Sequence, residues 1–212
     1  MRLLTLRLLA LFALLLAACD QPSSRPATSH PANQPSSHPA TQPSRIVDSI
    51  FPIEEEIRRF QAGLPPVTAL SGGAPSRDEL VHRFVTALED ADRSAFAPLM
   101  LDQSEFGYLY FPESRFTRKP YRTKPGLVWF QIQNASSKGI GRALTRLGGR
   151  PMGFRDYRCA AEPVVEGKNT LWEACTVSFR AAGTDSVRTM RLFGPILERD
   201  GVFKFMGYGN DF

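Results

Sequence analysis

Basic side chains gather in one stretch of the chain, and their types and spacing could bind an anion. Between Arg115 and Arg158 the sequence has eleven lysines and arginines and one acidic residue, Asp156. Aromatic residues lie among them, namely Phe116, Tyr121, Trp129 and Phe154. Cations beside aromatic rings attract anions through charge and offer a surface for stacking. The alternative is that these cations occupy exposed helix and loop positions, and that acids elsewhere in the fold balance their charge.

Histidine and cysteine supply most nucleophilic and metal-binding sites, and both are scarce here. Two of the three histidines, His30 and His38, lie eight residues apart in a low-complexity segment without acidic or thiol partners. Only His82 lies in the part of the sequence that should fold, so a Ser–His–Asp or Cys–His arrangement is disfavoured. We therefore expect no metal site and no cofactor.

The N-terminus has the pattern of an export signal. Two arginines are followed by an apolar run, Leu8 to Leu16, and by the small residues Ala17 and Ala18. The run is too short to span a bilayer of about 30 Å, which needs roughly 20 apolar residues. We expect residues 1–18 to be a signal peptide that is removed after export.

The residues Leu16-Ala17-Ala18-Cys19 resemble the lipobox of bacterial lipoproteins. The resemblance implies cleavage before Cys19 and transfer of diacylglycerol to its thiol, so that acyl chains anchor the protein. It implies a place in the bacterial cell envelope, on the periplasmic side of a membrane. Asp20 resembles an inner-membrane retention signal of enteric bacteria, and the choice between inner and outer membrane stays open. The alternative is an ordinary secretory signal peptide cleaved after Ala18.

A segment of low complexity separates Cys19 from the part that should fold. It contains a repeat, Ser29 to Ser36 and again Ser37 to Ser44, and residues 20–44 have no Leu, Ile, Val or aromatic residue. Such a composition cannot bury enough apolar surface to offset its ordering entropy. We expect residues 19–45 to be a lipidated, disordered tether that could reach roughly 80 Å in a polyproline-like form.

The net charge of the exported chain limits its partners. Loss of Arg2 and Arg7 with the signal leaves 24 basic residues against 21 acidic ones. This small excess does not predict nucleic acid binding, and an exported protein would rarely meet nucleic acid. We expect the partners to be the membrane, through the N-terminal lipid, and an anionic envelope component or a small molecule. Nothing in the sequence indicates an oligomeric state.

Residues 46–212 are long enough for a single domain with its own core. We expect residues 46–75 to form a lead-in, with a short helix over Ile46–Gln61 followed by a loop rich in Gly and Pro. Residues 76–212 then form the core of the domain. Its first helix is indicated by a capping box at Ser76 to Glu79 and by the apolar stripe that follows.

Helical spacing also appears later in the chain. A short helical turn is expected over Ser94–Leu99, and apolar residues at three- and four-residue steps predict a helix over Trp129–Leu147. The alternative is a strand in place of the first turn or two, which rests on the alternation of Val128, Phe130 and Ile132. The aromatic residues 105–112 fit either a short strand or a helical turn.

From Gly153 onward the periodicity is that of strands. Tyr157–Val164 and Asn169–Arg180 flank Gly167 and predict a hairpin. Cys159 and Cys175 are each eight residues from Gly167, so we expect them to lie opposite each other. An exported protein meets an oxidising compartment, which favours a disulfide that faces the core. The alternative is two buried free thiols.

Two further strands are expected near the end of the chain, at Val187–Phe193 and Val202–Tyr208. Asp200-Gly201 should form the turn before the last strand. Helices followed by antiparallel strands predict an α+β fold, with N-terminal helices packed on a curved antiparallel sheet of about four strands.

This order of elements is similar to the nuclear transport factor 2-like superfamily, whose fold is a cone. The resemblance covers residues 76–212 and also rests on two short segments, Glu79-Leu80-Val81-x-x-Phe84 and Ala87-Leu88-x-x-Ala91-Asp92. The superfamily includes isomerases, cyclases and many binding modules without catalysis. A fold resemblance by itself does not supply a function.

The enzymes of that superfamily place a carboxylate base and a hydroxyl donor inside the cone. The resemblance implies these candidates by position: Asp92, Asp102 and Glu105 as base, and Tyr108, Tyr110 and Tyr157 as donor. None matches a motif of the superfamily. The alternatives are that Asp92 caps a helix, that Glu105 is solvated and that the tyrosines belong to the core.

We expect a membrane-anchored envelope lipoprotein whose domain is a binding or interaction module, and we assign no catalytic residue. The candidate binding residues are aromatic and basic: Tyr108, Tyr110, Trp129, Arg118, Arg122 and Tyr157. The alternative function is an isomerase or dehydratase of the nuclear transport factor 2-like kind that uses a buried carboxylate. A deep pocket with an acid and a tyrosine favours the enzyme, and a cone filled with apolar side chains would exclude it.

Overall fold

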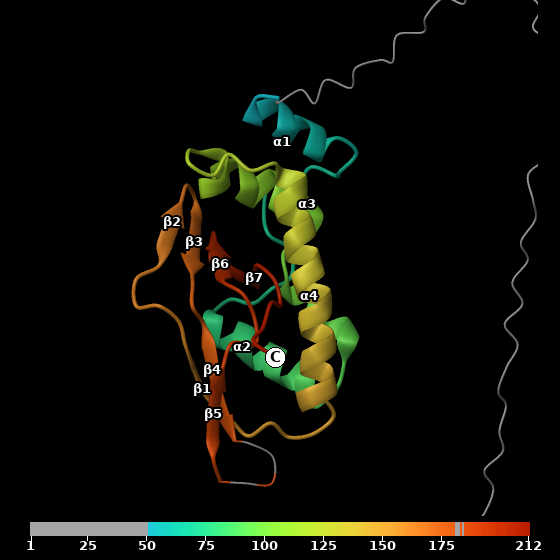
Figure 1. Cartoon of the computed structure of the whole chain (residues 1–212), viewed down its shortest axis with the longest axis vertical. Coiled ribbons are helices and arrows are strands. Elements are labelled where there is room, and N and C mark those ends of the chain that lie inside the picture. The colour runs from blue at the N-terminus through green and yellow to red at the C-terminus, as the bar shows by residue number, and fades with distance from the viewer. Residues whose placement is uncertain (1–50, 181–182, 184) are drawn as a thin grey trace, which may run out of the picture. The chain divides into compact units, whose positions relative to one another are not determined.

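The helices of the first half form where the sequence supplies caps and apolar stripes (Figure 1). A computed structural model describes residues 51–180, 183 and 185–212. Helix α1 spans Ile53–Gln61, and the predicted beginning of this helix before residue 51 lies outside the described residues. Helix α2 spans Arg77–Glu89, and the Ser76 hydroxyl accepts a hydrogen bond from the Glu79 amide at 3.1 Å, as the capping signal predicted.

Short helical segments connect α2 to the next long helix. They are η1 (Arg93–Leu99), α3 (Gln103–Glu105), η2 (Phe106–Tyr110), η3 (Phe111–Glu113) and η4 (Arg115–Thr117). The ambiguous residues 105–112 are therefore helical. Their aromatic side chains turn inward, and Phe106, Tyr110 and Phe111 are buried.

Helix α4 spans Pro125–Leu147 without a break, so the strand reading of its first turns is wrong. Its small residues have a packing role. A Cβ atom at Gly139 would lie 1.7 Å from the backbone oxygen of Tyr208. The Ser136 hydroxyl accepts a hydrogen bond from the Tyr208 amide at 3.0 Å, and the Asn210 side chain donates to the Gly139 carbonyl at 2.8 Å. Small side chains thus let the C-terminal segment cross α4 at close range.

Seven strands form two antiparallel sheets. One sheet has the order β1 (Phe154–Arg158), β4 (Thr176–Arg180), β5 (Val187–Met190). The other has the order β2 (Val164–Glu166), β3 (Asn169–Trp172), β6 (Ile196–Arg199), β7 (Val202–Phe205).

These strands are segments of four antiparallel passes of the chain. The first pass holds β1 and β2, the second holds β3 and β4, the third holds β5 and β6, and the last is β7. Each pass except the last is interrupted near its middle, so the sheet bends there (Figure 1). The predicted α+β class, with helices packed on a curved antiparallel sheet, is confirmed. The prediction missed β6, because the third pass breaks after Met190 and resumes at Ile196.

The hairpin at Gly167 and the disulfide are confirmed. Glu166 pairs with Asn169 across the turn, and Gly167 has a φ of 63°, which glycine adopts without strain. Cys159 and Cys175 form a disulfide with their Cα atoms 3.9 Å apart, and Cys175 is buried in the core.

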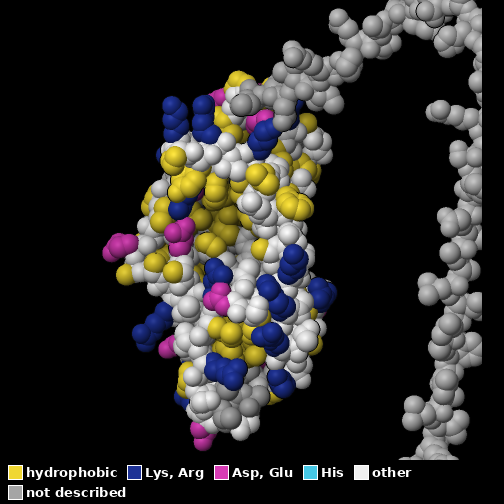
Figure 2. Space-filling model, in the orientation of Figure 1, with side chains coloured by type: hydrophobic (Ala, Val, Ile, Leu, Met, Phe, Trp, Pro, Cys, Tyr) yellow, Lys and Arg dark blue, Asp and Glu magenta, His cyan; other side chains and the backbone are white. Residues whose placement is uncertain are grey.

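The core has two clusters of apolar side chains. One lies around α2 and β7 and centres on Phe84, Phe205 and Tyr208. The other includes Phe106 and Leu171, with Trp129 packed against it. Figure 2 shows apolar side chains in a hollow between the β2–β3 hairpin and α4. No helix in the described ranges is long and apolar enough to cross a membrane.

Candidate functional site

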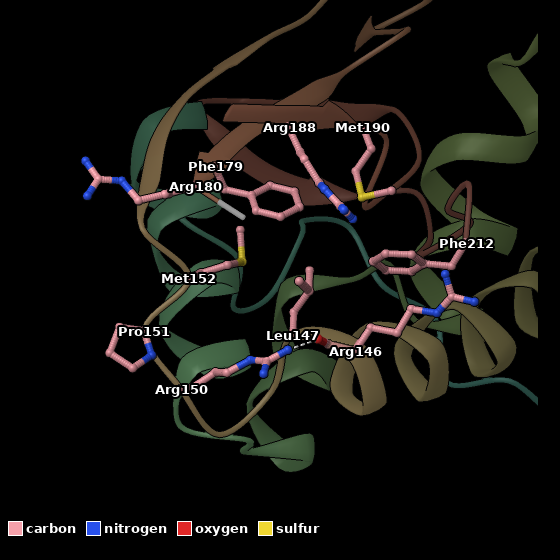
Figure 3. Close-up of a pocket in the computed structure, with 10 residues that line it drawn as sticks. All are labelled: Arg146, Leu147, Arg150, Pro151, Met152, Phe179, Arg180, Arg188, Met190 and Phe212. Atoms are coloured by element: carbon pink, nitrogen blue, oxygen red, sulfur yellow. Dashed lines mark hydrogen bonds between the residues drawn. The ribbon is translucent and has the colours of Figure 1, made fainter. Parts of the chain in front are cut away.

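Four arginines surround a cleft of about 240 Å³ at the end of the domain where α4 finishes. They are Arg146, Arg150, Arg180 and Arg188, and we call this site the arginine cleft. Its apolar lining comes from Leu147, Met152, Phe179, Met190 and Phe212 (Figure 3). The cleft thus combines a positively charged rim with an apolar floor.

Three different elements bring the arginines together. Arg146 lies in the last turn of α4, and Arg150 follows two glycines that end the helix. Gly149 has a φ of 74°, which lets the chain reverse directly after α4. Arg180 ends β4, and Arg188 belongs to the neighbouring strand β5. Figure 3 shows the Arg188 side chain pointing into the cleft and that of Arg180 pointing away from it.

Three of these four arginines have no carboxylate partner in the described part of the chain. The Arg146 guanidinium lies over the Phe212 ring, 4.9 Å from its centroid, and Arg150 donates to the backbone oxygen of Arg146 at 2.5 Å. Arg180 lies 3.8 Å from Asp185, whose side chain is fully exposed. Among the residues that the structure describes, no carboxylate is paired with Arg146, Arg150 or Arg188.

This arrangement suits recognition of an anion. A guanidinium presents planar, paired donors that match a phosphate or carboxylate. Cations around a concave, partly apolar surface also concentrate the positive potential. Because no carboxylate that the structure describes pairs with Arg146, Arg150 or Arg188, an external anion would not have to displace one from these three side chains.

The predicted basic stretch is divided between distant parts of the domain. Arg146 and Arg150 reach the cleft, whereas Arg118 and Arg122 lie before the other end of α4 and are exposed. Arg115 points inward and pairs with acids. Sequence reasoning missed Arg180 and Arg188, since they come from strands outside the stretch. The signal that could have found them is the antiparallel pairing of β4 with β5, which brings Arg180 opposite Val187.

The six predicted binding residues do not meet in one place. The Tyr108 hydroxyl lies 3.4 Å from the backbone oxygens of Gln61 and Leu64. Trp129 packs against the ring of Phe106 at 5.1 Å. The Tyr157 hydroxyl donates to Asp78 at 2.6 Å on the other side of the fold. Burial and this hydrogen bond raise the pKa of Tyr157 to about 12.

Tyr110 belongs to a polar cluster near the second apolar cluster of the core. Arg115 donates to Glu166 through Nε and to Glu173 at 2.9 Å. Burial, and next the charge of Glu166, raise the pKa of Tyr110 well above its ordinary value. One oxygen of Glu166, Oε2, is buried and has no hydrogen-bond partner in the described ranges. This cluster brings together an acid and a tyrosine, which is the pair that an isomerase would need.

The three carboxylates proposed as bases have structural roles. Asp92 caps η1 through the Ser94 amide, as the alternative reading expected, and Asp102 caps α3. Glu105 is fully buried, so the expectation that it is solvated is wrong. It pairs with Lys204 at 2.7 Å and accepts a hydrogen bond from the Ser71 amide at 2.7 Å.

Comparisons with protein-family models, with curated proteins and with solved structures find no match to this chain. The resemblances to the lipobox and to the nuclear transport factor 2-like superfamily therefore stay predictions. In the described part of the chain, no group of three or more His, Cys, Asp or Glu side chains is placed to hold a metal ion. The function has to be argued from the geometry of the site.

Proposed function

We propose that this protein is a lipid-anchored lipoprotein of the bacterial envelope, and that its domain binds an anionic ligand in the arginine cleft without catalysis. The observation that carries the proposal is the set of arginines on one rim. Arg146, Arg150 and Arg188 surround an apolar floor and pair with no carboxylate among the described side chains. Cations held together without internal partners are a binding surface for an external anion.

The lining of the cleft specifies the ligand class. A phosphate or carboxylate group would accept hydrogen bonds from the arginines. The group attached to that anion would lie against Met152, Phe179 and Met190, which are partly or fully buried. The best ligand is therefore an anion that carries a small apolar group next to its charge.

Calorimetric titration with hexyl phosphate tests the binding proposal. We expect saturable binding that weakens at high salt, with inorganic phosphate binding more weakly because it cannot use the apolar floor. The double variant Arg146→Glu/Arg150→Glu should bind hexyl phosphate at least tenfold more weakly. The matched control is Arg93→Glu/Lys138→Glu, which changes the net charge equally at exposed positions outside the cleft. An equal loss in both double variants would refute the cleft as the site.

The lipid anchor is tested separately. The sequence Leu16-Ala17-Ala18-Cys19 supports cleavage before Cys19 and lipidation of its thiol. We expect mass spectrometry of the N-terminal peptide to show a diacylglycerol on Cys19, and the Cys19→Ala variant to leave the membrane fraction. A mature chain with an unmodified thiol at Cys19 would refute the lipoprotein assignment.

An isomerase or dehydratase of the nuclear transport factor 2-like kind has one observation in its favour, the buried Glu166 beside Tyr110. The Nε atom of Arg115 donates a hydrogen bond to Oε1 of Glu166, so a partner within the domain already occupies that oxygen. We therefore favour the binding module. Enzymatic turnover that is lost in Glu166→Gln but kept in Arg146→Glu/Arg150→Glu would reverse this choice.

A further inference from the structure

The end of the domain opposite the arginine cleft exposes large apolar side chains. Leu127 and Phe130 lie in the first turns of α4 with 50% and 64% of their surface exposed. They are three residues apart, so they share one face of the helix. Tyr121, in the loop before α4, is 55% exposed and contacts the ring of Phe116. These three side chains, Tyr121, Leu127 and Phe130, make up what we call the apolar tip.

Cations lie next to the apolar tip in the sequence and in space. Arg118, Lys119, Arg122 and Lys124 occupy the same loop and are exposed. Lys124 lies 3.6 Å from Glu56 of α1, so the loop and α1 are neighbours. Among the acids of α1, Glu55 accepts hydrogen bonds from Arg58 and Arg59, and its charge is thereby balanced within the helix. Exposed apolar groups beside lysines and arginines are typical of surfaces that enter the interface of an anionic bilayer.

The rest of the chain enters the domain at this same end. Phe51 and Pro52 line a cleft together with Arg122 and Lys124, so the first described residues lie beside the cationic loop. Residues 20–50 connect this point to Cys19. A lipid on Cys19 would therefore be joined to the domain through this end, which is the part of the domain nearest to the anchor along the chain.

We propose that the apolar tip and the loop at 118–124 form a second membrane contact, which lays this end of the domain on an anionic bilayer. Tyr121, Leu127 and Phe130 enter the headgroup region, and Arg118 and Lys119 contact lipid phosphates. The arginine cleft lies beyond the other end of α4, a helix of 23 residues, or about 34 Å along its axis. The cleft therefore faces away from the anchoring membrane. This inference rests on the proposed lipid anchor at Cys19.

The test uses the full lipidated chain in vesicles of phosphatidylethanolamine and phosphatidylglycerol. A spin label is placed at position 130 through Phe130→Cys, and at position 187 through Val187→Cys as a matched control. Val187 is similarly exposed, at 54%, but lies in β5 beside the cleft. We expect the label at 130 to collide with oxygen in the bilayer and to be shielded from a polar nickel complex. The label at 187 should stay accessible to the nickel complex.

Two measurements distinguish the membrane contact at the apolar tip from the lipid anchor at Cys19. They are the effect of charge variants on the label at 130 and the sedimentation of the chain with vesicles. Arg118→Glu/Lys119→Glu, added to Phe130→Cys, should lower the bilayer-contacting population about fivefold or more for each charge removed. Vesicles of phosphatidylcholine alone should also lose the contact. A label at 130 in water, on a chain that still sediments with vesicles, would overturn the membrane contact and leave the lipid anchor intact. Protection at 130 that requires another protein would overturn it as well. A chain that does not sediment at all would instead refute the anchor.

Discussion

Basic side chains behave differently in the two halves of this domain. Near the β2–β3 hairpin, Arg115 pairs with Glu166 and Glu173, and Arg199 pairs with Glu113. At the arginine cleft, Arg146 and Arg188 are exposed and pair with no carboxylate that the structure describes. Both regions are rich in arginine, but the regular pairing of arginine with buried or half-buried carboxylates occurs near the β2–β3 hairpin.

The difference shows where stability and recognition are located. A buried charge must be paired, because an uncompensated charge in the interior is costly. The interior pairs are therefore needed for folding and are unavailable to a ligand. Exposed arginines contribute little to folding and keep their donors for a partner. Substitutions in the interior ion pairs should therefore change stability alone. Substitutions of the exposed arginines in the cleft should change binding alone.

The largest expected effect is on the buried pair of Glu105 with Lys204. Lys204→Met leaves the Glu105 carboxylate without its cation, and we expect the free energy of unfolding to fall by about 3–5 kcal/mol. Urea unfolding measures this change. The double variant Glu105→Gln/Lys204→Met should recover part of the loss, since no buried charge then remains. A loss below about 1 kcal/mol in the single variant would contradict the role given to the interior pairs.

The disulfide joins the chain near the bend that separates the two halves. It closes a loop with a sequence separation of 16 residues, and its removal in Cys159→Ala/Cys175→Ala should lower the free energy of unfolding by about 3 kcal/mol. Thermal unfolding with and without reductant measures this effect on the wild type. Reductant should not change the stability of the double variant. If reductant also lowers the stability of the double variant, the loss seen in the wild type does not come from the disulfide.

The arginine cleft should show the opposite behaviour. We expect Arg188→Ala to weaken hexyl phosphate binding about tenfold, because a hydrogen bond to a charged group contributes about 1.5 kcal/mol or more. The free energy of unfolding should stay within about 0.5 kcal/mol of the wild type, since the side chain is exposed and pairs with no carboxylate that the structure describes. A variant that unfolds more easily and binds normally would break the distinction between the two halves.

The smallest effect concerns Tyr157, a predicted binding residue whose hydroxyl donates a hydrogen bond to Asp78 within the domain. Its pKa is raised to about 12 by burial and by the bond to Asp78. A raised pKa means that the neutral phenol is favoured in the folded state. Its stabilising contribution is complete below about pH 10, the unfolded pKa, and is lost as the pH rises to about 12. Asp78→Asn should lower this pKa, and absorbance at 295 nm during alkaline titration follows it. An unchanged titration would mean that Asp78 does not raise the pKa of Tyr157.

Local sequence signals predicted the elements that depend on local chemistry. The cap at Ser76 and the hairpin at Gly167 each need a few neighbouring residues, and both were found. The pairing of Cys159 with Cys175 followed from counting outward from one turn. The curved sheet was predicted, but the break of the predicted strand Asn169–Arg180 into β3 and β4 was not, because it occurs at Ala174, a non-glycine residue with a φ of 51°.

The candidate site could be predicted only in part. Arg146 and Arg150 belong to the basic stretch that the sequence singled out, but the grouping with Arg180 and Arg188 depends on tertiary packing. Glu105 was expected in solvent, since nothing near it in the sequence indicates Lys204, which lies 99 residues away. Long-range partners decide whether a charged residue is used for folding or left for a ligand.

Methionine methyl groups offer the most direct test of the arginine cleft. Met152 and Met190 line the cleft, whereas Met100 and Met206 pack elsewhere in the core. In the chain without its signal peptide, and so without Met1, labelled with ¹³C at the methionine methyls, titration with hexyl phosphate should shift the Met152 and Met190 signals and leave the other two in place. The shifts should vanish in Arg146→Glu/Arg150→Glu and persist in Arg93→Glu/Lys138→Glu. Unmoved Met152 and Met190 signals at millimolar hexyl phosphate, or equal shifts of all four, would contradict an anion site in the cleft.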